Sequence, residues 1–189
     1  MTPVGILLAA GRGRRFDPSG NRNKLLQPLA DGEPVVVASA RALLAALPHV
    51  IAVVRRADGG VADALRALGC DVTVCPDADD GMAASLVHAI GHSLPLAQAW
   101  LIALGDMPRV RVSTIAALSD ALAGGADIAA PMHAGRRGNP VGFGIACLPA
   151  LLALAGDEGA RGILKRHPVS EVAVDDPGIF DDIDQPDDL

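Results

Sequence analysis

A loop rich in glycine and arginine follows the first apolar segment of the chain. The segment Val4–Ala9 reads VGILLA, and residues 11 to 24 carry five cations and one acid. This loop therefore has a local charge of +4 (five minus one) in a chain whose formal net charge is −6. A buried strand that opens into a flexible cationic loop presents backbone N–H groups and positive charge to phosphates. The pattern predicts a nucleotide site.

The loop differs from the commonest phosphate-binding motifs. Its glycines at 11 and 13 begin a GxGxxG pattern, but Phe16 stands where the third glycine belongs. No GK[ST] sequence follows, which excludes a P-loop. What remains are small residues at 9 to 11, which let the backbone approach a base or phosphate closely, and two cations, Arg15 and Lys24, that can neutralise a triphosphate. A solvated basic loop without a ligand is the alternative interpretation.

A second candidate is the aspartate of the sequence LGDMP, residues 104–108. The apolar run before it predicts a strand that delivers Asp106 at its carboxyl end, where Pro108 prevents regular continuation. Mg²⁺ binds proteins through one or two carboxylates and takes its other ligands from phosphates and water. Because the cationic loop is expected at the same sheet edge, Asp106 is predicted to bind Mg²⁺. Helix capping is the alternative role.

A third and weaker signal is the sequence GMAASL, which starts at Gly81 and opens a predicted helix. Its free N–H groups and positive dipole end would face the same sheet edge. Ser85, one turn into the helix, is placed to reach a ribose or a base. Asp79 or Asp80 is predicted to cap this helix.

Strand and helix patterns alternate along the chain. Apolar runs predict strands at 4–9, 50–54, 72–74, 100–104, 128–130, 141–145 and 172–174, and segments rich in Ala and Leu predict helices at 34–47, 60–69, 82–93, 112–123, 148–155 and 159–166. This order predicts an α/β fold: a single Rossmann-like three-layer domain over residues 1–189 with a mostly parallel, doubly wound sheet. Ligands of such sheets bind beyond the carboxyl ends of the strands. The segment 131–147 interrupts the alternation and predicts an inserted loop or hairpin.

Composition narrows the class of protein. Hydrophobic residues make up 50% and aromatic residues 2%, which predicts an interior of Val, Ile, Leu and Ala. The net charge of −6 argues against a nucleic-acid partner, and residues 175–189 hold seven aspartates and no cation. The three cysteines lack metal-ligand spacing and predict reduced thiols. The first apolar run is too short for a membrane anchor and has no basic region before it, so we expect no membrane partner and a cytoplasmic location.

Six motifs, taken in order, resemble those of the molybdenum-cofactor nucleotidyltransferases, and the match is closest to the molybdopterin cytidylyltransferase branch. They are LAAG with the following Arg and Lys, GMxxSL, LGDMP, GRRGNPVGF, GDEGAR and DIDQPDDL. The resemblance implies a fold of the nucleotide-diphospho-sugar transferase type. It also implies an enzyme that moves a nucleoside monophosphate from a triphosphate onto the terminal phosphate of molybdopterin, with release of pyrophosphate and with Mg²⁺ at the aspartate of LGDMP. A client molybdoenzyme is the implied protein partner.

The resemblance also implies roles for individual positions. The catalytic residues would be Arg15, Lys24 and Asp106. The nucleotide would contact Leu8, Ala9, Ala10, Gly11, Gly13, Arg15, Lys24, Gly81 and Ser85. The pterin-bearing substrate would contact Arg137, Gly138, Asn139, Pro140, Asp157, Gly159 and Arg161. The metal ligands would be Asp106 and Asp184, although an exposed acidic tail is the alternative for Asp184.

The choice of substrates rests on a few positions. Guanylyl-transferring relatives usually read LAGG where this chain has Ala10, and the added methyl narrows the base pocket. This favours a pyrimidine and therefore CTP, although one methyl discriminates by only about 1–3 kcal/mol. Asn139 replaces the usual His of the family motif, which leaves two alternatives open. One is a cytidylyl-, uridylyl- or guanylyltransferase for another phosphorylated acceptor, such as a sugar phosphate. The other is a non-catalytic chaperone that binds the nucleotide or cofactor.

Overall fold

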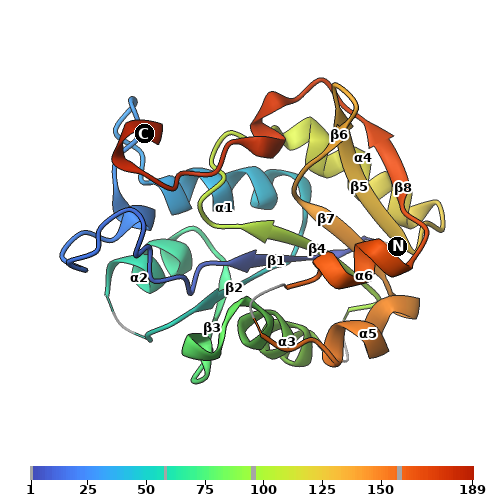
Figure 1. Cartoon of the computed structure of the whole chain (residues 1–189), viewed down its shortest axis with the longest axis horizontal. Helices are drawn as coiled ribbons and strands as arrows, with labels where there is room; N and C mark the ends of the chain where they lie inside the picture. Colours follow the sequence, from blue (N-terminus) through green and yellow to red (C-terminus); the bar gives the residue numbers. More distant parts are fainter. Residues whose placement is uncertain (1, 58, 95–96, 157–158) are drawn as a thin grey trace.

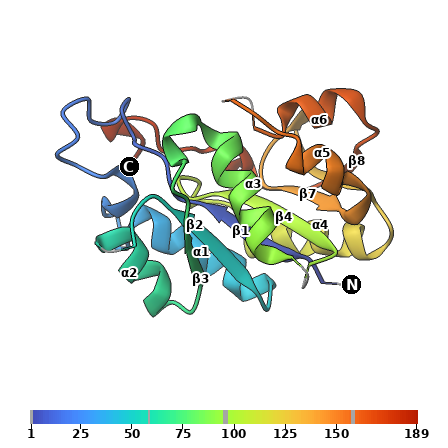
Figure 2. The same cartoon turned by 90° about the horizontal axis from the view of Figure 1, so that it is seen from below.

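Helices cover both faces of one central sheet (Figure 1 and Figure 2). The coordinates are those of a computed structural model, which describes residues 2–57, 59–94, 97–156 and 159–189. In these residues the strands are β1 (Val4–Leu8), β2 (Val50–Val54), β3 (Asp71–Val74), β4 (Ala99–Leu104), β5 (Ile128–His133), β6 (Arg136–Arg137), β7 (Val141–Gly144) and β8 (Ser170–Ala173). The α-helices are α1 (Val35–Ala46), α2 (Gly60–Ala67), α3 (Met82–Ser93), α4 (Val112–Ala123), α5 (Leu148–Leu152) and α6 (Arg161–Arg166).

The sheet has the strand order β3-β2-β1-β4-β7-β5-β6, and β8 pairs with β5. β1 lies between β2 and β4 and is parallel to both. The carboxyl ends of these three strands therefore meet at one edge of the sheet, and the loops that follow them are neighbours. The predicted single α/β domain with a mostly parallel sheet is confirmed.

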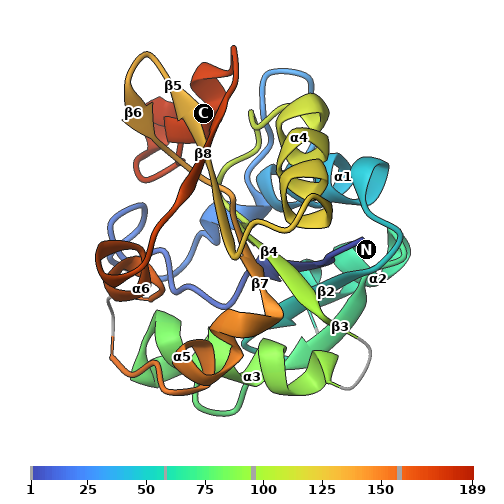
Figure 3. The ribbon, with the colours of Figure 1, turned by 90° about the vertical axis from the view of Figure 1, so that its right-hand side faces the viewer.

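The central strands are buried on both faces, as their continuous apolar sequences predict. Successive side chains of a strand point to opposite faces. Thus Leu7 packs in the core shared with α1, α2 and α4, and Ile6 packs in the core shared with α3, α5 and α6. Figure 3 shows these helix layers on either side of the sheet.

The segment 131–147 contains both a hairpin and a strand of the central sheet. β5 and β6 pair antiparallel across Ala134 and Gly135, both of which have positive φ. The chain then returns as β7, which lies antiparallel between β4 and β5. The hairpin was expected from the sequence, but the position of β7 inside the sheet was not.

The C-terminal strap, residues 174–189, runs back from β8 across the carboxyl end of β4 (Figure 1). Its buried Asp176 accepts hydrogen bonds from the backbone N–H of Arg111 at 2.9 Å and from the Thr114 hydroxyl at 2.6 Å. A Cβ atom at Gly178 would lie 2.1 Å from the Arg109 carbonyl oxygen, so only glycine fits there. Further along, the N–H of Ile183 donates to the Asp106 carbonyl at 2.9 Å. These contacts fix an aspartate-rich tail against the edge where β4 ends.

We predict that folding stability falls as the pH rises through the range in which Cys70 ionises. Burial raises the pKa of the Cys70 thiol from 9.0 to about 11. Between these two values the unfolded chain loses a proton that the folded chain keeps, so the free energy of unfolding decreases. Urea titrations at about pH 8 and about pH 10 measure the loss. Cys70→Ala is expected to show a smaller loss than the parent protein, and an equal loss in both proteins would contradict the prediction.

Candidate active site

A cavity of about 580 Å³ opens at the carboxyl ends of β1 and β4. This volume lies within the range of sites for small molecules and cofactors. Segments that are remote in the sequence form its wall: the loop after β1, the residue after β2, the segment between β3 and α3, the start of α3, the end of β4 and one residue of the C-terminal strap. The lining residues are Leu8, Ala10, Gly11, Arg12, Gly13, Arg14, Arg15, Phe16, Lys24, Leu25, Arg55, Ala78, Asp79, Gly81, Met82, Ser85, Leu104, Asp106 and Asp184. We call it the first cavity.

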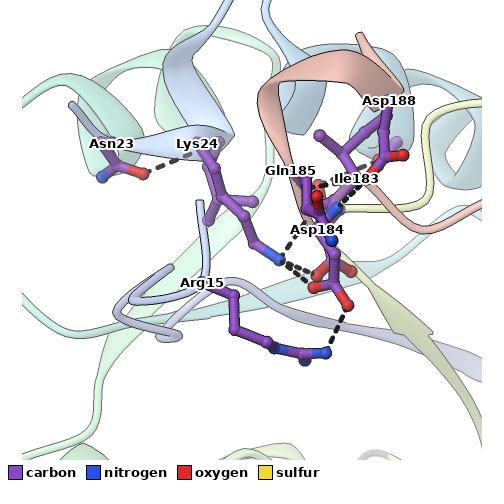
Figure 4. A network of polar contacts seen from close by, with 11 residues as sticks. Arg15, Asn23, Lys24, Ile183, Asp184, Gln185 and Asp188 are labelled. Atoms are coloured by element: carbon purple, nitrogen blue, oxygen red, sulfur yellow. Dashed lines mark hydrogen bonds and ion pairs between the residues drawn. The ribbon is translucent and has the colours of Figure 1, made fainter. Parts of the chain in front are cut away.

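The ammonium group of Lys24 is the centre of the polar network in this cavity (Figure 4). Its Nζ lies 2.5 Å from Asp106 Oδ2, 2.9 Å from the Ile183 carbonyl oxygen and 3.4 Å from Asp184 Oδ1. Only 11% of the Lys24 side chain is exposed. A buried ammonium requires charged or hydrogen-bonding partners, and here three acceptors supply them. The network therefore joins the loop after β1, the end of β4 and the strap.

Arg15 extends the network toward solvent. Its Nη1 lies 2.5 Å from Asp184 Oδ2, and 79% of its side chain is exposed. Asp184 thus contacts both candidate phosphate-binding cations, and Figure 4 shows it between them. The backbone N–H of Asp184 donates to Asp188 Oδ2 at 2.9 Å, which holds the end of the strap in a turn. Asp184 lines the first cavity and its side chain is only 21% exposed, so the structure contradicts its alternative placement in an exposed acidic tail.

The carboxylates of this network fit a divalent cation. Asp106 and Asp184 already converge on one cationic group, and carboxylate oxygens are the ligands that Mg²⁺ prefers. The pKa of a third carboxyl, Asp182, is raised by burial and by the nearby charges of Asp184 and Asp106. In the part of the chain that the structure describes, no three His, Cys, Asp or Glu side chains form a metal cluster, but Mg²⁺ needs only one or two carboxylates when phosphates complete its shell.

The other end of the cavity is closed by two arginines that share one carboxylate. Arg12 Nε donates to Asp79 Oδ1 at 2.8 Å, and Arg55 also binds Asp79. Arg55 Nη2 donates to the Ala10 carbonyl oxygen at 2.8 Å. We call Arg12, Asp79 and Arg55 the arginine clamp. It ties the loop after β1 to the ends of β2 and β3.

The start of α3 differs from the prediction in its cap. Gly81 occupies the N-cap position with φ of 112°, which favours glycine, and no side chain caps the helix. Asp79 binds the arginine clamp instead, so the prediction that Asp79 or Asp80 caps the helix was wrong. Gly81, Met82 and the buried Ser85 line the first cavity, whereas the Ala83 N–H donates to the Gly156 carbonyl at 3.2 Å. A polar ligand group can therefore bind there.

The structure gathers nearly all of the predicted nucleotide and metal residues around the first cavity. Ala9 is the exception: it is buried beneath the loop and does not line this space. The residues predicted for the pterin-bearing substrate lie outside the lining. Arg137 is exposed and pairs with Glu171, while Asn139 donates its N–H to the Ile179 carbonyl at 3.0 Å.

Four of the remaining predicted substrate residues, Gly138, Pro140, Gly159 and Arg161, lie in the described part of the chain. Gly138 packs against Ile179, and Pro140 lines a small separate space with Leu104. A Cβ atom at Gly159 would lie 3.1 Å from the sulfur of Met82, so this residue borders the lining of the cavity. Arg161 is exposed at the start of α6. Asp157 lies outside the described residues.

Sequence reasoning missed Arg55 and gave Asp79 another role. Arg55 directly follows β2, so its position at the carboxyl end of a predicted strand was a usable signal. The sequence analysis placed nucleotide and metal residues only in the loops after the first, third and fourth strands. Asp79 carried a weaker signal, because its pairing partners are 67 and 24 residues away in the sequence.

We predict that Lys24→Met destabilises the ligand-free protein by about 1–3 kcal/mol, because Asp106 loses its cation and Asp184 keeps only the exposed Arg15. Adding Asp184→Asn removes one of the two negative charges, so the cost of losing Lys24 should be smaller in this background. A double-mutant cycle of unfolding free energies measures the coupling. Additive effects of the two substitutions would show that the carboxylates do not share the ammonium.

Comparison with known proteins identifies the family of the chain. Residues 5–172 match the sequence profile of the MobA-like NTP transferase domain. The purine catabolism protein PucB of Bacillus subtilis (strain 168) is 33% identical over 97% of this chain and 92% of its own length.

None of the described helices is both long enough and apolar enough to cross a membrane.

A solved structure extends this similarity to the fold. Rv0371c of Mycobacterium tuberculosis H37Rv is 32% identical, with a TM-score of 0.81 over 100% of this chain and 96% of that one. Its complex with manganese is 31% identical and has a TM-score of 0.78, with the same coverage of both chains. The profile match and these relatives agree with the motifs and with the order of the strands. The chain therefore belongs to the MobA-like NTP transferase family, which confirms its resemblance to the molybdenum-cofactor nucleotidyltransferases.

Proposed function

We propose that this nucleotidyltransferase, acting as one domain over residues 1–189, transfers CMP from CTP to the terminal phosphate of molybdopterin or the molybdenum cofactor. The observation that carries the proposal is the shared position of Lys24, Arg15 and two carboxylates at one end of the first cavity. Cations for the phosphates and ligands for a metal thus lie together, and the start of α3 offers N–H groups at the base end.

In the proposed reaction, the acceptor phosphate attacks the α-phosphorus of the bound triphosphate. A bond forms from the acceptor oxygen to the α-phosphorus, and the bond to the oxygen bridging the α- and β-phosphorus breaks, releasing pyrophosphate. Arg15 and Lys24 bind the β- and γ-phosphates and stabilise the charge that builds on the departing pyrophosphate. Mg²⁺, held by Asp106 and Asp184, would supply further positive charge there. No general base is needed, because a phosphate monoester is already anionic near neutral pH.

Binding of the triphosphate requires Lys24 to exchange partners. In the ligand-free structure its ammonium neutralises Asp106 and Asp184. Asp106 and Asp184 would instead hold the metal ion, and Lys24 would then bind phosphate oxygens. We therefore expect triphosphate and metal to bind more tightly together than either binds alone.

The base, the client enzyme, the cellular location and the acceptor site are each proposed from a separate observation. Ala10 lines the first cavity and its carbonyl accepts from Arg55 of the arginine clamp. A methyl in place of the glycine of guanylyl-transferring relatives would leave less room for the base, which supports a pyrimidine. The name of the relative PucB points to purine catabolism, so we propose a molybdoenzyme of that kind as the client. The free, buried cysteines at 70, 75 and 147 support a reducing, cytoplasmic location. Within this proposal Arg137, Gly138, Asn139, Pro140, Asp157, Gly159 and Arg161 serve the acceptor.

We predict that Asp106→Asn lowers turnover by at least about 10²-fold, the cost of one lost transition-state-stabilising group. The assay is pyrophosphate release from CTP with purified molybdopterin and Mg²⁺. Asp120→Asn, an exposed position on α4, makes the same chemical change away from the cavity and should retain normal turnover. Near-normal turnover in the Asp106 variant would remove this residue from the mechanism.

We predict that CTP with Mg²⁺ raises the melting temperature more than GTP, UTP or ATP does. Ligand binding to the folded state stabilises it by RT ln(1 + [L]/Kd), so the preferred base gives the largest shift at equal concentration. Each nucleotide is tested with and without Mg²⁺, and Lys24→Met should reduce every shift. A larger shift with GTP would overturn the choice of base. Equal shifts with and without Mg²⁺ would count against the metal.

A further inference from the structure

A second cavity, of about 730 Å³, lies on the far side of the arginine clamp from the first. It is formed by the loop after β1, the end of β2 and the start of α2, at the left of Figure 1. Both cavities share Gly11, Arg12, Arg14, Arg55, Ala78 and Asp79. The clamp is therefore a partition between two spaces. The proposed reaction uses only the first of them.

Cations dominate the wall of the second cavity. Among the residues that the structure describes, five arginines and two acids line it, and these are Arg12, Arg14, Arg22, Arg55, Arg56, Asp17 and Asp79. Their formal charge is +3 (five minus two). The protein as a whole has a formal net charge of −6, so the charge of this wall is opposite in sign to that of the chain. Such a surface attracts anions.

Both acids of this wall are already engaged. Within the arginine clamp, Asp79 pairs with Arg12 and Arg55. The carboxylate of Asp17 accepts hydrogen bonds from the Ser19 hydroxyl at 2.6 Å and from the backbone N–H of Arg22 at 2.7 Å. These bonds, led by that from Ser19, lower the pKa of Asp17.

Three arginines of the wall have no carboxylate partner in the described part of the chain. Among the described residues, no carboxylate forms an ion pair with Arg14, Arg22 or Arg56. Arg22 lies instead over the ring of Phe16, with its guanidinium carbon 5.3 Å from the ring centre. The pKa of Arg55 is lowered by burial and then by the charges of Arg12, Arg14 and Arg56. The wall thus holds cations that repel one another.

The start of α2 adds hydrogen-bond donors to the same wall. Gly59, Gly60, Val61 and Ala62 all line the cavity. Gly59 is the N-cap residue, with φ of 94° and no side-chain hydrogen bond to the helix. The first N–H groups of a helix carry partial positive charge and bind anions such as phosphate. A Cβ atom at Gly60 would lie 2.6 Å from Leu26 Cδ1, so the end of the Leu26 side chain packs closely against this glycine.

We propose that the second cavity binds a small molecule carrying two or more phosphate groups, at a site separate from the triphosphate of the first cavity. Three arginines and the start of one helix converge there, and arginine side chains bind phosphate oxygens strongly through paired hydrogen bonds. A concave space of this volume favours a small molecule over an extended polymer. This inference does not depend on the proposed transfer reaction.

The test uses inorganic tripolyphosphate as the probe, titrated by calorimetry without nucleotide or acceptor. Arg22→Ser/Arg56→Ser removes two cations that line only the second cavity, and Arg15→Ser/Lys24→Met removes two that line only the first. Lys165→Ser/Arg166→Ser changes the net charge equally at exposed positions of α6. We expect the second-cavity variant to lose at least about tenfold in affinity at one site, the equivalent of one charge-assisted contact. The first-cavity variant should keep that site, and the α6 variant should match the parent protein.

Two results would overturn the proposal: loss of all tripolyphosphate binding in the first-cavity variant, or unchanged binding in the second-cavity variant. Amide hydrogen exchange provides a second readout that needs no first-cavity variant. Tripolyphosphate should slow exchange at residues 60–62 of the parent protein, but not of Arg22→Ser/Arg56→Ser. No slowing in the parent protein would also overturn the proposal. Since nucleotide and acceptor are absent, failure here leaves the proposed transfer reaction untouched.

Discussion

The arrangement of the site depends on a buried lysine that neutralises two carboxylates. Lys24 follows the loop after β1, Asp106 follows β4, and Asp184 comes from the end of the chain, yet all three meet within 3.4 Å of one nitrogen atom. A buried ammonium without acceptors would be costly, and so would two neighbouring carboxylates without a cation. Each charged group therefore lowers the energetic cost of burying the others. A polyphosphate binds cations such as the Lys24 ammonium, and a divalent cation binds carboxylates such as those of Asp106 and Asp184. In the ligand-free structure these groups bind one another, and the ligands can replace those contacts.

The parallel sheet explains why such distant residues meet. β1, β2 and β4 are adjacent and run in the same direction, so their following loops open at one edge. Arg55 at the end of β2 reaches back to Ala10 and Asp79, and the residues of this clamp line both cavities at the edge. The first cavity combines cations with Asp106 and Asp184. The second gathers arginines whose charge is left in excess.

The sequence predicted the sheet edge well because local signals define it. Continuous apolar runs indicated the strands, and the residues directly after them, from Gly11 to Arg15 and at Asp106, were identified from position alone. Arg55 followed a strand in the same way, but the loop after β2 was not considered. Asp79 was assigned to a helix cap on local grounds. Its real partners come from other loops, and no local pattern indicates them.

By itself, the sequence determined the α/β alternation, the burial of the strands on both faces and the family of the chain, because periodicity and short motifs are properties of neighbouring residues. Only the tertiary structure decided the place of β7 inside the sheet, the contact of Asp184 with Lys24 and Arg15, and the division of the edge into two cavities. The acidic tail illustrates the difference. Its composition alone indicates a solvated segment, whereas the close approach of Gly178 to Arg109 and the buried bonds of Asp176 direct it into the site. Contacts of that kind depend on which surfaces pack against each other in the folded chain. Local sequence patterns do not indicate them, because the residues that meet are distant in the sequence.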